Sequence, residues 1–403
     1  MKFVTFVSLL SGALAASSSC SFSTTITAAA GISQLNACPT LEGDISVSGD
    51  GVSGAVDLSS VEEIKADIKF FNSSTATSLI LNKLQKISGS LSIDMFTQLF
   101  TLDFSSLSEV NELSLVSLPS LSTINLNKGV SKANSIEISD TAIGSLEGLT
   151  NYDSVGILNV NNNKNITMIG LNLTEVTENL ILSFNSDDCE VYLDQLEIAS
   201  NLTIQDVAAL SLKNLTYVNG TFQIAYNTFE KLDVDTLQEV GSAFQVFAND
   251  DLKSVSFADL TKINGELRMS NNTVLEDLGS TFENLTTIAG ALNVQGDIAN
   301  FSLPALKKVA GDFDFTSTNE DFDCSDFEKQ QSDGKILGHN FNCTVPEKSS
   351  SVSGSGSATS KGSSKTGSSS SDSSSSKKND GISAHSGSVI LAAFFGALLS
   401  VFL

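Results

Sequence analysis

Residues 215–227 read LTYVNGTFQIAYN, and the same pattern recurs along the chain. With Leu215 counted as offset 0, apolar residues stand at offsets 0, +3, +7 and +9, a glycine stands at +5 and an asparagine at +12. The pattern begins again at Leu237 and at Leu260, after steps of 22 and 23 residues. A period of this length is typical of a solenoid, in which each repeat forms one coil that stacks on the coil before it.

The pattern extends in both directions from this stretch. Clear copies begin at Cys38, Val61, Leu84, Leu173, Leu285 and Leu306. Weaker copies begin near Leu107 (one residue short), Gly129, Asn151 and Gln195. Together they predict about thirteen coils of 21–25 residues between Cys38 and Phe315.

Each offset has a physical interpretation. The apolar pair at +7 and +9 forms one face of a short strand, because side chains on one face recur every second residue. We expect the glycine at +5 to occupy a bend with positive φ just before that strand. The asparagine at +12 should bond turn backbone groups and the asparagine of the next coil, a structural role rather than a binding role. It occurs as Asn163, Asn185, Asn227, Asn249 and Asn272.

Composition excludes several classes of function. The formal net charge of the 403 residues is −24, and Arg268 is the only arginine, so we expect no binding to nucleic acid. His339 and His385 are the only histidines, so most catalytic sites and metal sites that depend on histidine side chains are excluded. We therefore predict no cofactor and no metal site.

The beginning of the chain and its cysteines indicate a secreted protein. Residues 1–15 have the charged start, apolar core and small-residue cleavage pattern of a signal peptide. The compartment that it implies permits disulfides. We predict the bridges Cys20–Cys38 and Cys324–Cys343, which would close the two ends of the solenoid and stabilise each by about 3 kcal/mol. Cys189 remains, and we expect a buried, inert thiol there rather than a reactive one.

Ten sequons of the form N-x-[ST] predict heavy N-glycosylation, although asparagine-rich turns also generate this pattern by accident. They lie at Asn72, Asn165, Asn172, Asn201, Asn214, Asn219, Asn271, Asn284, Asn300 and Asn342.

The chain after the repeats has a different composition. Residues 16–346 form the predicted repeat region, and residues 347–379, rich in serine, a disordered stalk. The apolar end Val389–Leu403 is short for a membrane span, and small residues and a polar spacer precede it. This arrangement predicts a GPI anchor attached at Asn379, with Gly381 as second choice, and removal of residues 380–403. The alternative is a hydrophobic tail that stays in the membrane.

These features together resemble a known family. The motifs Leu237–Val246, Leu260–Leu267 and Leu285–Leu292 of the repeats carry the resemblance, together with the signal peptide, the end cysteines, the stalk and the GPI signal. The chain resembles the fungal GPI-anchored cell-wall organisation glycoproteins of the extracellular-mutant and sporulation-specific type. Their ectodomain is similar to the leucine-rich repeats of receptor L-domains. This implies a mainly β, right-handed parallel β-solenoid, built as one solenoid or as two L-domains.

The same resemblance implies a function without catalytic residues. The chain would organise the fungal cell wall and maintain its integrity, from the outer leaflet of the plasma membrane or linked to the wall. Its partners would be the membrane, through the GPI lipid, and wall polysaccharide such as glucan or mannan. No protein partner is specified. Lys377 and Lys378 fit the dibasic pattern tied in such proteins to retention at the plasma membrane.

Two other functions compete with this hypothesis. The first is an adhesin or polysaccharide-binding surface protein, disfavoured because the chain has no Trp, only four Tyr, and most of its 24 Phe at core offsets. The second is a polysaccharide hydrolase or lyase, which would need paired carboxylates as acid and base. Candidate carboxylates are Asp187, Asp188, Asp250, Asp251, Asp312, Asp314, Asp321, Asp323 and Asp326. Close carboxylates are expected in so acidic a chain, so the enzyme is the least favoured of the three.

Overall fold

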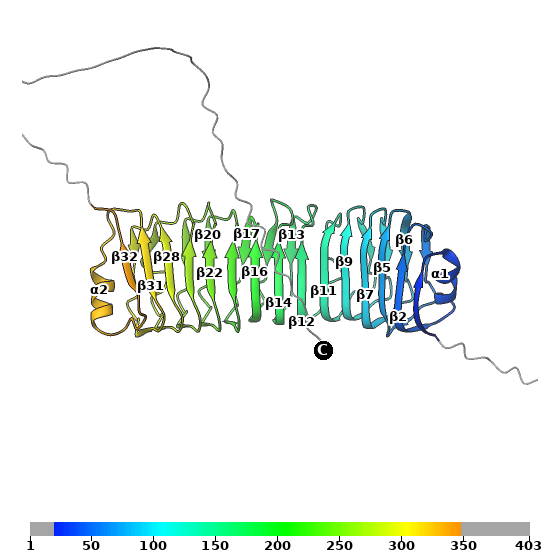
Figure 1. The fold of residues 1–403 in the computed structure, drawn as a ribbon, viewed down its shortest axis with the longest axis horizontal. Helices are drawn as coiled ribbons and strands as arrows, with labels where there is room; N and C mark the ends of the chain where they lie inside the picture. Colours follow the sequence, from blue (N-terminus) through cyan, green and yellow to red (C-terminus); the bar gives the residue numbers. More distant parts are fainter. Residues whose placement is uncertain (1–19, 348–403) are drawn as a thin grey trace, which may run out of the picture. The chain divides into compact units, whose positions relative to one another are not determined.

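The computed structural model describes residues 20–347. The predicted signal peptide, nearly all of the predicted stalk and the predicted anchor site lie outside this range. The described residues form a parallel β-solenoid of about 14 turns (Figure 1).

One large parallel sheet runs the length of the solenoid, and each coil adds one step to it. In the first coils each step is a single strand: β1 (Ser21–Ile26), β2 (Thr40–Ser48), β5 (Asp67–Ser73), β7 (Lys86–Phe96), β9 (Glu109–Leu118), β11 (Lys132–Thr141), β12 (Ser154–Asn161), β14 (Glu175–Ser183) and β16 (Ile198–Gln205). The short strand β4 (Glu63–Ile64) precedes β5. In the later coils each step is a pair of short strands: β18 (Tyr217–Val218) with β19 (Phe222–Ala225), β21 (Glu239–Val240) with β22 (Phe244–Phe247), β24 (Lys262–Ile263) with β25 (Leu267–Ser270), β27 (Thr287–Ile288) with β28 (Leu292–Gly296), and β30 (Lys308–Val309) with β31 (Phe313–Ser317). The last strand is β32 (Phe341–Thr344).

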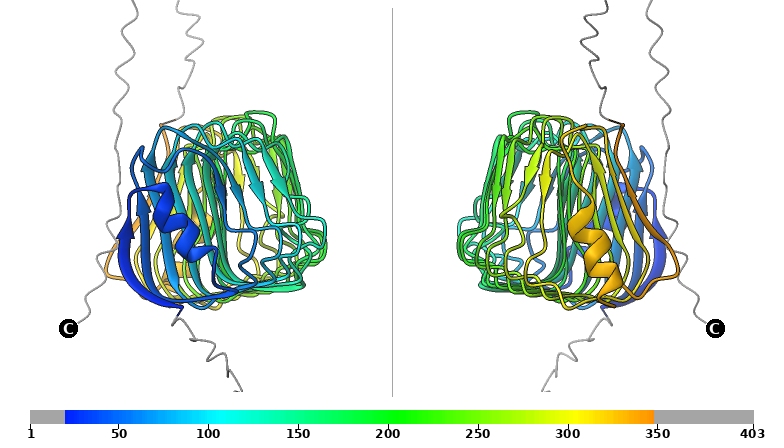
Figure 2. Two further views of the ribbon diagram at one scale, coloured as in Figure 1. Left: turned by 90° about the vertical axis from the view of Figure 1, so that its right-hand side faces the viewer. Right: turned by 90° about the vertical axis from the view of Figure 1, so that its left-hand side faces the viewer.

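The opposite side of most coils carries much shorter strands (Figure 2). They form one sheet of β3 (Gly54–Asp57), β6 (Ala76–Ile80), β8 (Thr101–Asp103) and β10 (Thr123–Asn125), and a second of β13 (Met168–Gly170), β15 (Glu190–Tyr192) and β17 (Ala209–Ser211). Two further pairs are β20 (Lys231–Asp233) with β23 (Ser254–Ser256), and β26 (Asp277–Leu278) with β29 (Asn300–Phe301). The short strands on the opposite side are interrupted between β10 and β13. The large sheet continues there through the pairing of β11 with β12, so residues 20–347 form one continuous solenoid.

The predicted apolar column is confirmed by the strand register. Phe222 pairs with Phe244, Phe244 with Leu267, and Leu267 with Leu292, all in parallel. All four side chains are buried, and the rings of Phe222 and Phe244 stack with their centroids 5.1 Å apart. The repeat therefore places like residues on neighbouring strands, and their contact fills the core.

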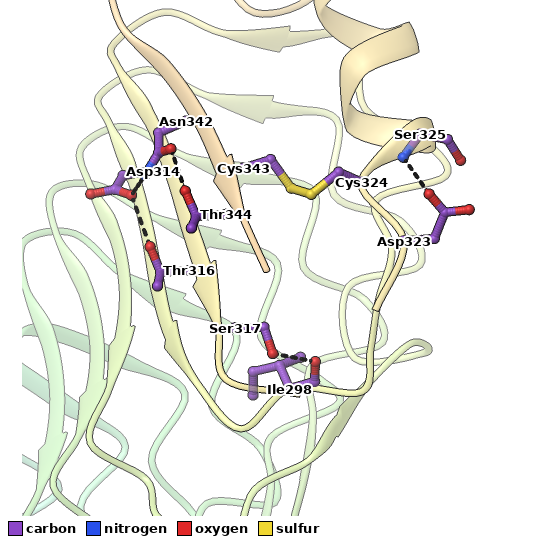
Figure 3. Close-up of a disulfide and its surroundings, with 10 residues drawn as sticks. All are labelled: Ile298, Asp314, Thr316, Ser317, Asp323, Cys324, Ser325, Asn342, Cys343 and Thr344. Carbon is purple, nitrogen blue, oxygen red and sulfur yellow. Dashed lines mark hydrogen bonds between the residues drawn. A yellow bond between two sulfur atoms is a disulfide. The ribbon is translucent and has the colours of Figure 1, made fainter. Parts of the chain in front are cut away.

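The two ends of the solenoid are closed as the cysteines predict. Helix α1 (Ala29–Leu35) lies across the first coil, and α2 (Ser325–Ser332) across the last (Figure 2). The disulfides Cys20–Cys38 and Cys324–Cys343 tie these caps to strands, and Figure 3 shows the second bridge. Strands β1 and β32 add a step at each end, beyond the thirteen coils predicted from Cys38 to Phe315.

The predicted role of the asparagine at +12 is also confirmed. The Asn249 side chain is fully buried, and its Oδ1 accepts from the backbone N–H of Asn227 at 3.0 Å and from the Asn227 amide at 2.9 Å. The Asn249 amide donates to the Ile224 carbonyl at 3.2 Å and to Asn272 Oδ1 at 3.1 Å. Buried turn groups are thereby bonded from one coil to the next.

The prediction that the glycine at +5 occupies a bend with positive φ was wrong. Only Gly43 among these glycines has a positive φ, of 93°. At Gly290 an added Cβ would lie 2.6 Å from the carbonyl carbon of Gly265 and 2.7 Å from its oxygen. The Gly290 N–H donates to that same oxygen at 2.9 Å. Glycine is needed because the backbones of adjacent coils approach too closely for a side chain.

The positive φ instead occurs at offset +11, immediately before the ladder asparagine. Ten residues other than glycine have φ between 52° and 60° there, at intervals of about one coil: Asn72, Met95, Ser117, Asp140, Asn162, Phe184, Asp206, Tyr226, Ala248 and Asn271. A left-handed residue is unusual outside glycine and asparagine, and here it turns the chain at the end of each long strand. Side chains at this offset line the edge of the outer surface.

Candidate functional site

The large sheet carries no acidic side chain at two rows of outward positions, offsets +8 and +10, over its middle coils. Phe222 and Ile224 are buried in the core, so the alternation of strand side chains directs Gln223 and Ala225 outward. From β12 to β28 the outward positions at +8 are Asn159, Ile181, Thr203, Gln223, Gln245, Arg268 and Asn293, and those at +10 are Asn161, Ser183, Gln205, Ala225, Phe247, Ser270 and Gln295. We call these positions the neutral face. It contains no Asp or Glu, although the chain has 46 acidic residues.

Three aromatic rings, two exposed and one half-buried, lie along the edge of the neutral face. Phe184 and Tyr226 stand at offset +11 and are 39% and 52% exposed, and Phe247 stands at +10 and is half-buried. The ring centroids of Phe184 and Tyr226 are 6.5 Å apart, and those of Tyr226 and Phe247 are 5.7 Å apart. We call these three rings the aromatic row.

The single arginine of the chain extends the aromatic row. The Arg268 guanidinium lies over the Phe247 ring, 5.1 Å from its centroid. No ion pair joins it to a carboxylate among the described residues, so its N–H donors are not used by a carboxylate there. Two buried polar atoms beside it, the Ser270 hydroxyl and the Asn293 Oδ1, also have no hydrogen-bond partner in residues 20–347.

Sequence reasoning missed the aromatic row because it assigned phenylalanine to the core by default. Phe222 and Phe244, at offset +7, follow that expectation. Phe184 and Phe247 do not, because offsets +10 and +11 point away from the core. The offset within the repeat was the signal that separates the two groups.

The predicted glycosylation sites lie on the surface of the described solenoid. Nine of the ten asparagines are exposed, and Asn201 is half-buried. The Asn201 amide donates at 3.2 Å both to the Glu178 carbonyl and to Asn179 Oδ1, so a glycan there would displace these bonds. None of the ten occupies a position of the neutral face. Glycosylation at these residues stays a prediction.

The paired carboxylates near the C-terminal cap bond neighbouring strands and turns. Asp314 Oδ1 accepts from the Asn342 amide at 2.9 Å, as Figure 3 shows. Hydrogen bonds from the side chain and backbone of Asn340 lower the pKa of Asp312. A general acid in glycoside hydrolysis needs a raised pKa, so this shift makes Asp312 unsuited to that role.

The remaining candidates offer little chemistry. In the described part of the chain, no three His, Cys, Asp or Glu residues are grouped so as to hold a metal ion. Cys189 is buried as expected. Burial first, and then the Asp206 and Glu190 carboxylates, raise its pKa to about 11, which disfavours the reactive thiolate.

A polar hollow of about 520 Å³ lies where the short strands of the opposite side are interrupted, between Ser122–Asn127 and Ile143–Leu149. Within residues 20–347, neither helix has the length and apolar character needed to cross a membrane.

Comparison with known proteins finds close relatives in fungi. The chain is 49% identical to the cell surface GPI-anchored protein ECM33 of Candida albicans, over 87% of this chain and 85% of that protein. It is 34% identical to the cell wall mannoprotein PST1 of Saccharomyces cerevisiae, over 80% of this chain and 72% of that protein. Sporulation-specific protein 2 of the same yeast is 31% identical over 77% of this chain and 62% of its own length. No family model and no solved structure matches the chain.

Proposed function

Because the chain belongs to the family of fungal cell-surface and cell-wall proteins that includes ECM33 and PST1, we propose that it organises the wall by contact and not by catalysis. Family membership places it at the cell surface, with a role in cell-wall organisation. The named relatives include no enzyme. The observation that carries the proposal is the neutral face, two rows of outward positions with no acidic residue on a strongly acidic protein.

The parts of the chain have separate tasks in this proposal. The solenoid presents an extended surface, its glycans keep that surface hydrated, and the stalk holds it away from the membrane. A GPI lipid at Asn379, or at Gly381, anchors the whole. The contacted material is wall polysaccharide, glucan or mannan. The tasks of the stalk and anchor rest on the composition of residues 347–403.

Complementation of a deletion strain tests the anchored role. Cells that lack the gene should grow poorly in the presence of a wall-binding dye, and the full chain should restore growth. A chain that ends before Val389 should be secreted into the medium and should fail to restore growth. Restoration by the secreted form would refute the requirement for an anchor. Mass spectrometry of the C-terminal peptide would identify the attachment residue, and release by phospholipase or by glucanase would separate membrane retention from linkage to the wall.

A direct assay tests the absence of catalysis. The purified mature chain should release no reducing ends from β-glucan, chitin or mannan. Release that an Asp→Asn substitution abolishes would establish an enzyme and overturn the proposal.

A further inference from the structure

We propose that the aromatic row and the neutral face form a binding site for a neutral polysaccharide, whose sugar rings stack on Tyr226 and its neighbours. This inference rests on the proposed function and deepens it, because it assigns the contact to particular residues. The site is built from the middle coils, from β14 to β28.

The aromatic row is suited to stacking. Exposed aromatic residues are common singly, but here Phe184, Tyr226 and Phe247 make successive ring contacts on one surface. The faces of aromatic rings accept the C–H groups of a pyranose ring, and a buried aromatic ring contributes a large contact area. Ala225, the outward neighbour of Phe247 on the adjacent strand, is fully buried although it stands apart from the core cluster. The outer side chains therefore pack over Ala225. Because this packing already restricts the rings of the aromatic row, they lose little conformational entropy on binding.

Unused hydrogen-bonding groups lie directly beside the rings. The half-buried side chains of Gln205, Gln223 and Gln245 make no hydrogen bond within residues 20–347. Each amide offers both donors and an acceptor, as sugar hydroxyls require. Arg268 adds N–H donors that pair with no carboxylate in the described chain. Ser270 is 5% exposed, and its buried hydroxyl has no partner there. Buried polar groups are normally bonded, so an unpartnered one at this position points to a ligand.

The charge of the surface selects a neutral ligand. The net charge of −24 disfavours the approach of a polyanion, which would find a single arginine at the site. A polycation would find no carboxylate at any position of the neutral face. Asp206, between Phe184 and Tyr226 at the same offset, is the one acidic group at the aromatic row, and a single carboxylate also accepts sugar hydroxyls.

The repeat of the solenoid matches an extended chain of sugars. Neighbouring strands lie about 4.8 Å apart, which is close to the length of one pyranose unit. A polysaccharide that runs along the solenoid axis therefore meets an equivalent side chain at each coil. No predicted glycosylation site occupies the neutral face itself. Asn201 lies two residues before Thr203 on β16, and Asn271 directly follows Ser270 at offset +11.

Binding of defined oligosaccharides to the mature full chain tests the site. The probes are soluble oligomers of β-1,3-linked glucose, of N-acetylglucosamine and of mannose, measured by isothermal titration calorimetry. One class should bind, Tyr226→Ala should weaken that binding at least about tenfold, or roughly 1.4 kcal/mol, and Tyr226→Phe should change it little. Phe100→Ala is the matched control, because Phe100 is 48% exposed beside β8 on the opposite side. Equal thermal unfolding midpoints would show that the variants are folded.

Three results would overturn the site. The first is the absence of binding to all three probes, and the second is equal affinity of the Tyr226→Ala and Phe100→Ala variants. The third is binding by an Asn271→Gln variant but not by the wild-type chain, which would make the aromatic row a cover for the protein's own glycan. None of these results bears on the wall role, which is measured separately by restoration of growth in the deletion strain.

Discussion

Replacement of Asn249 by alanine tests whether the buried asparagine ladder stabilises the solenoid. The Asn249 side chain accepts two hydrogen bonds from Asn227 and donates to the carbonyls of Ile224 and Phe247 and to Asn272 Oδ1. Alanine removes all five bonds and leaves the backbone N–H of Asn227 buried without this acceptor, since Asn227 is only 2% exposed.

The magnitude follows from these contacts. A buried polar group that loses its partner costs about 1–3 kcal/mol, and each ordinary bond that is lost costs about 1 kcal/mol. We therefore expect Asn249→Ala to lower the free energy of unfolding by at least about 3 kcal/mol, a large fraction of the 5–15 kcal/mol typical of a folded domain. Asn249→Leu should be equally harmful, because it restores volume but leaves the same N–H unbonded.

Urea-induced unfolding, followed by circular dichroism with the disulfides intact, measures this change. The control is Asp250→Ala, because Asp250 is exposed at the next position and its loss should alter stability by less than about 0.5 kcal/mol. Hydrogen exchange at the backbone N–H of Asn227 should accelerate in both Asn249 variants. If Asn249→Ala were as stable as the control, or if Asn249→Leu restored stability, the hydrogen bonds would not be the cause.

Three further predictions concern packing, burial and the caps. Gly290→Ala should destabilise the protein by about 1–3 kcal/mol in the same assay, because the added Cβ would collide with the backbone of the previous coil. Gly170→Ala is the control, since a Cβ there meets nothing within 4 Å, and equal effects of the two variants would contradict the close-approach argument. Tyr152→Phe should raise stability by about 1 kcal/mol, since its buried hydroxyl has no partner in the described chain, and a loss of stability would reveal a bond that the structure does not contain. Replacing Cys324 and Cys343 together by serine should cost about 3 kcal/mol, because the bridge closes a 19-residue separation, and an unchanged thermal midpoint would show that the cap holds without it.

The repeat made much of this fold predictable. Phe222 and Phe244 occupy the same offset, and their register on neighbouring strands follows directly from that fact. The ladder asparagines and both disulfides were predictable for the same reason, because a stacked coil must bond its buried turns and close its ends. Strands β1 and β32 were missed because the end coils depart from the pattern of the repeat.

The candidate site was less predictable. The offsets of Phe184 and Phe247 lie outside the core positions, but the general preference of phenylalanine for the interior outweighed that signal. Residue type alone also does not reveal that Arg268 stacks on Phe247 and has no ion-pair partner within residues 20–347. The site depends on which side chains become neighbours across coils.

The amino-acid sequence by itself determined the parallel solenoid, its core column and its sulfur-bridged ends, because a fixed period repeats the same local choice at every coil. Only the tertiary structure decided why glycine is required at Gly290 and where Tyr226 meets Phe247. The physical reason is the same in both cases. The close approach of one coil to the next is a distance between residues about 22 positions apart, and no local preference of the chain encodes it.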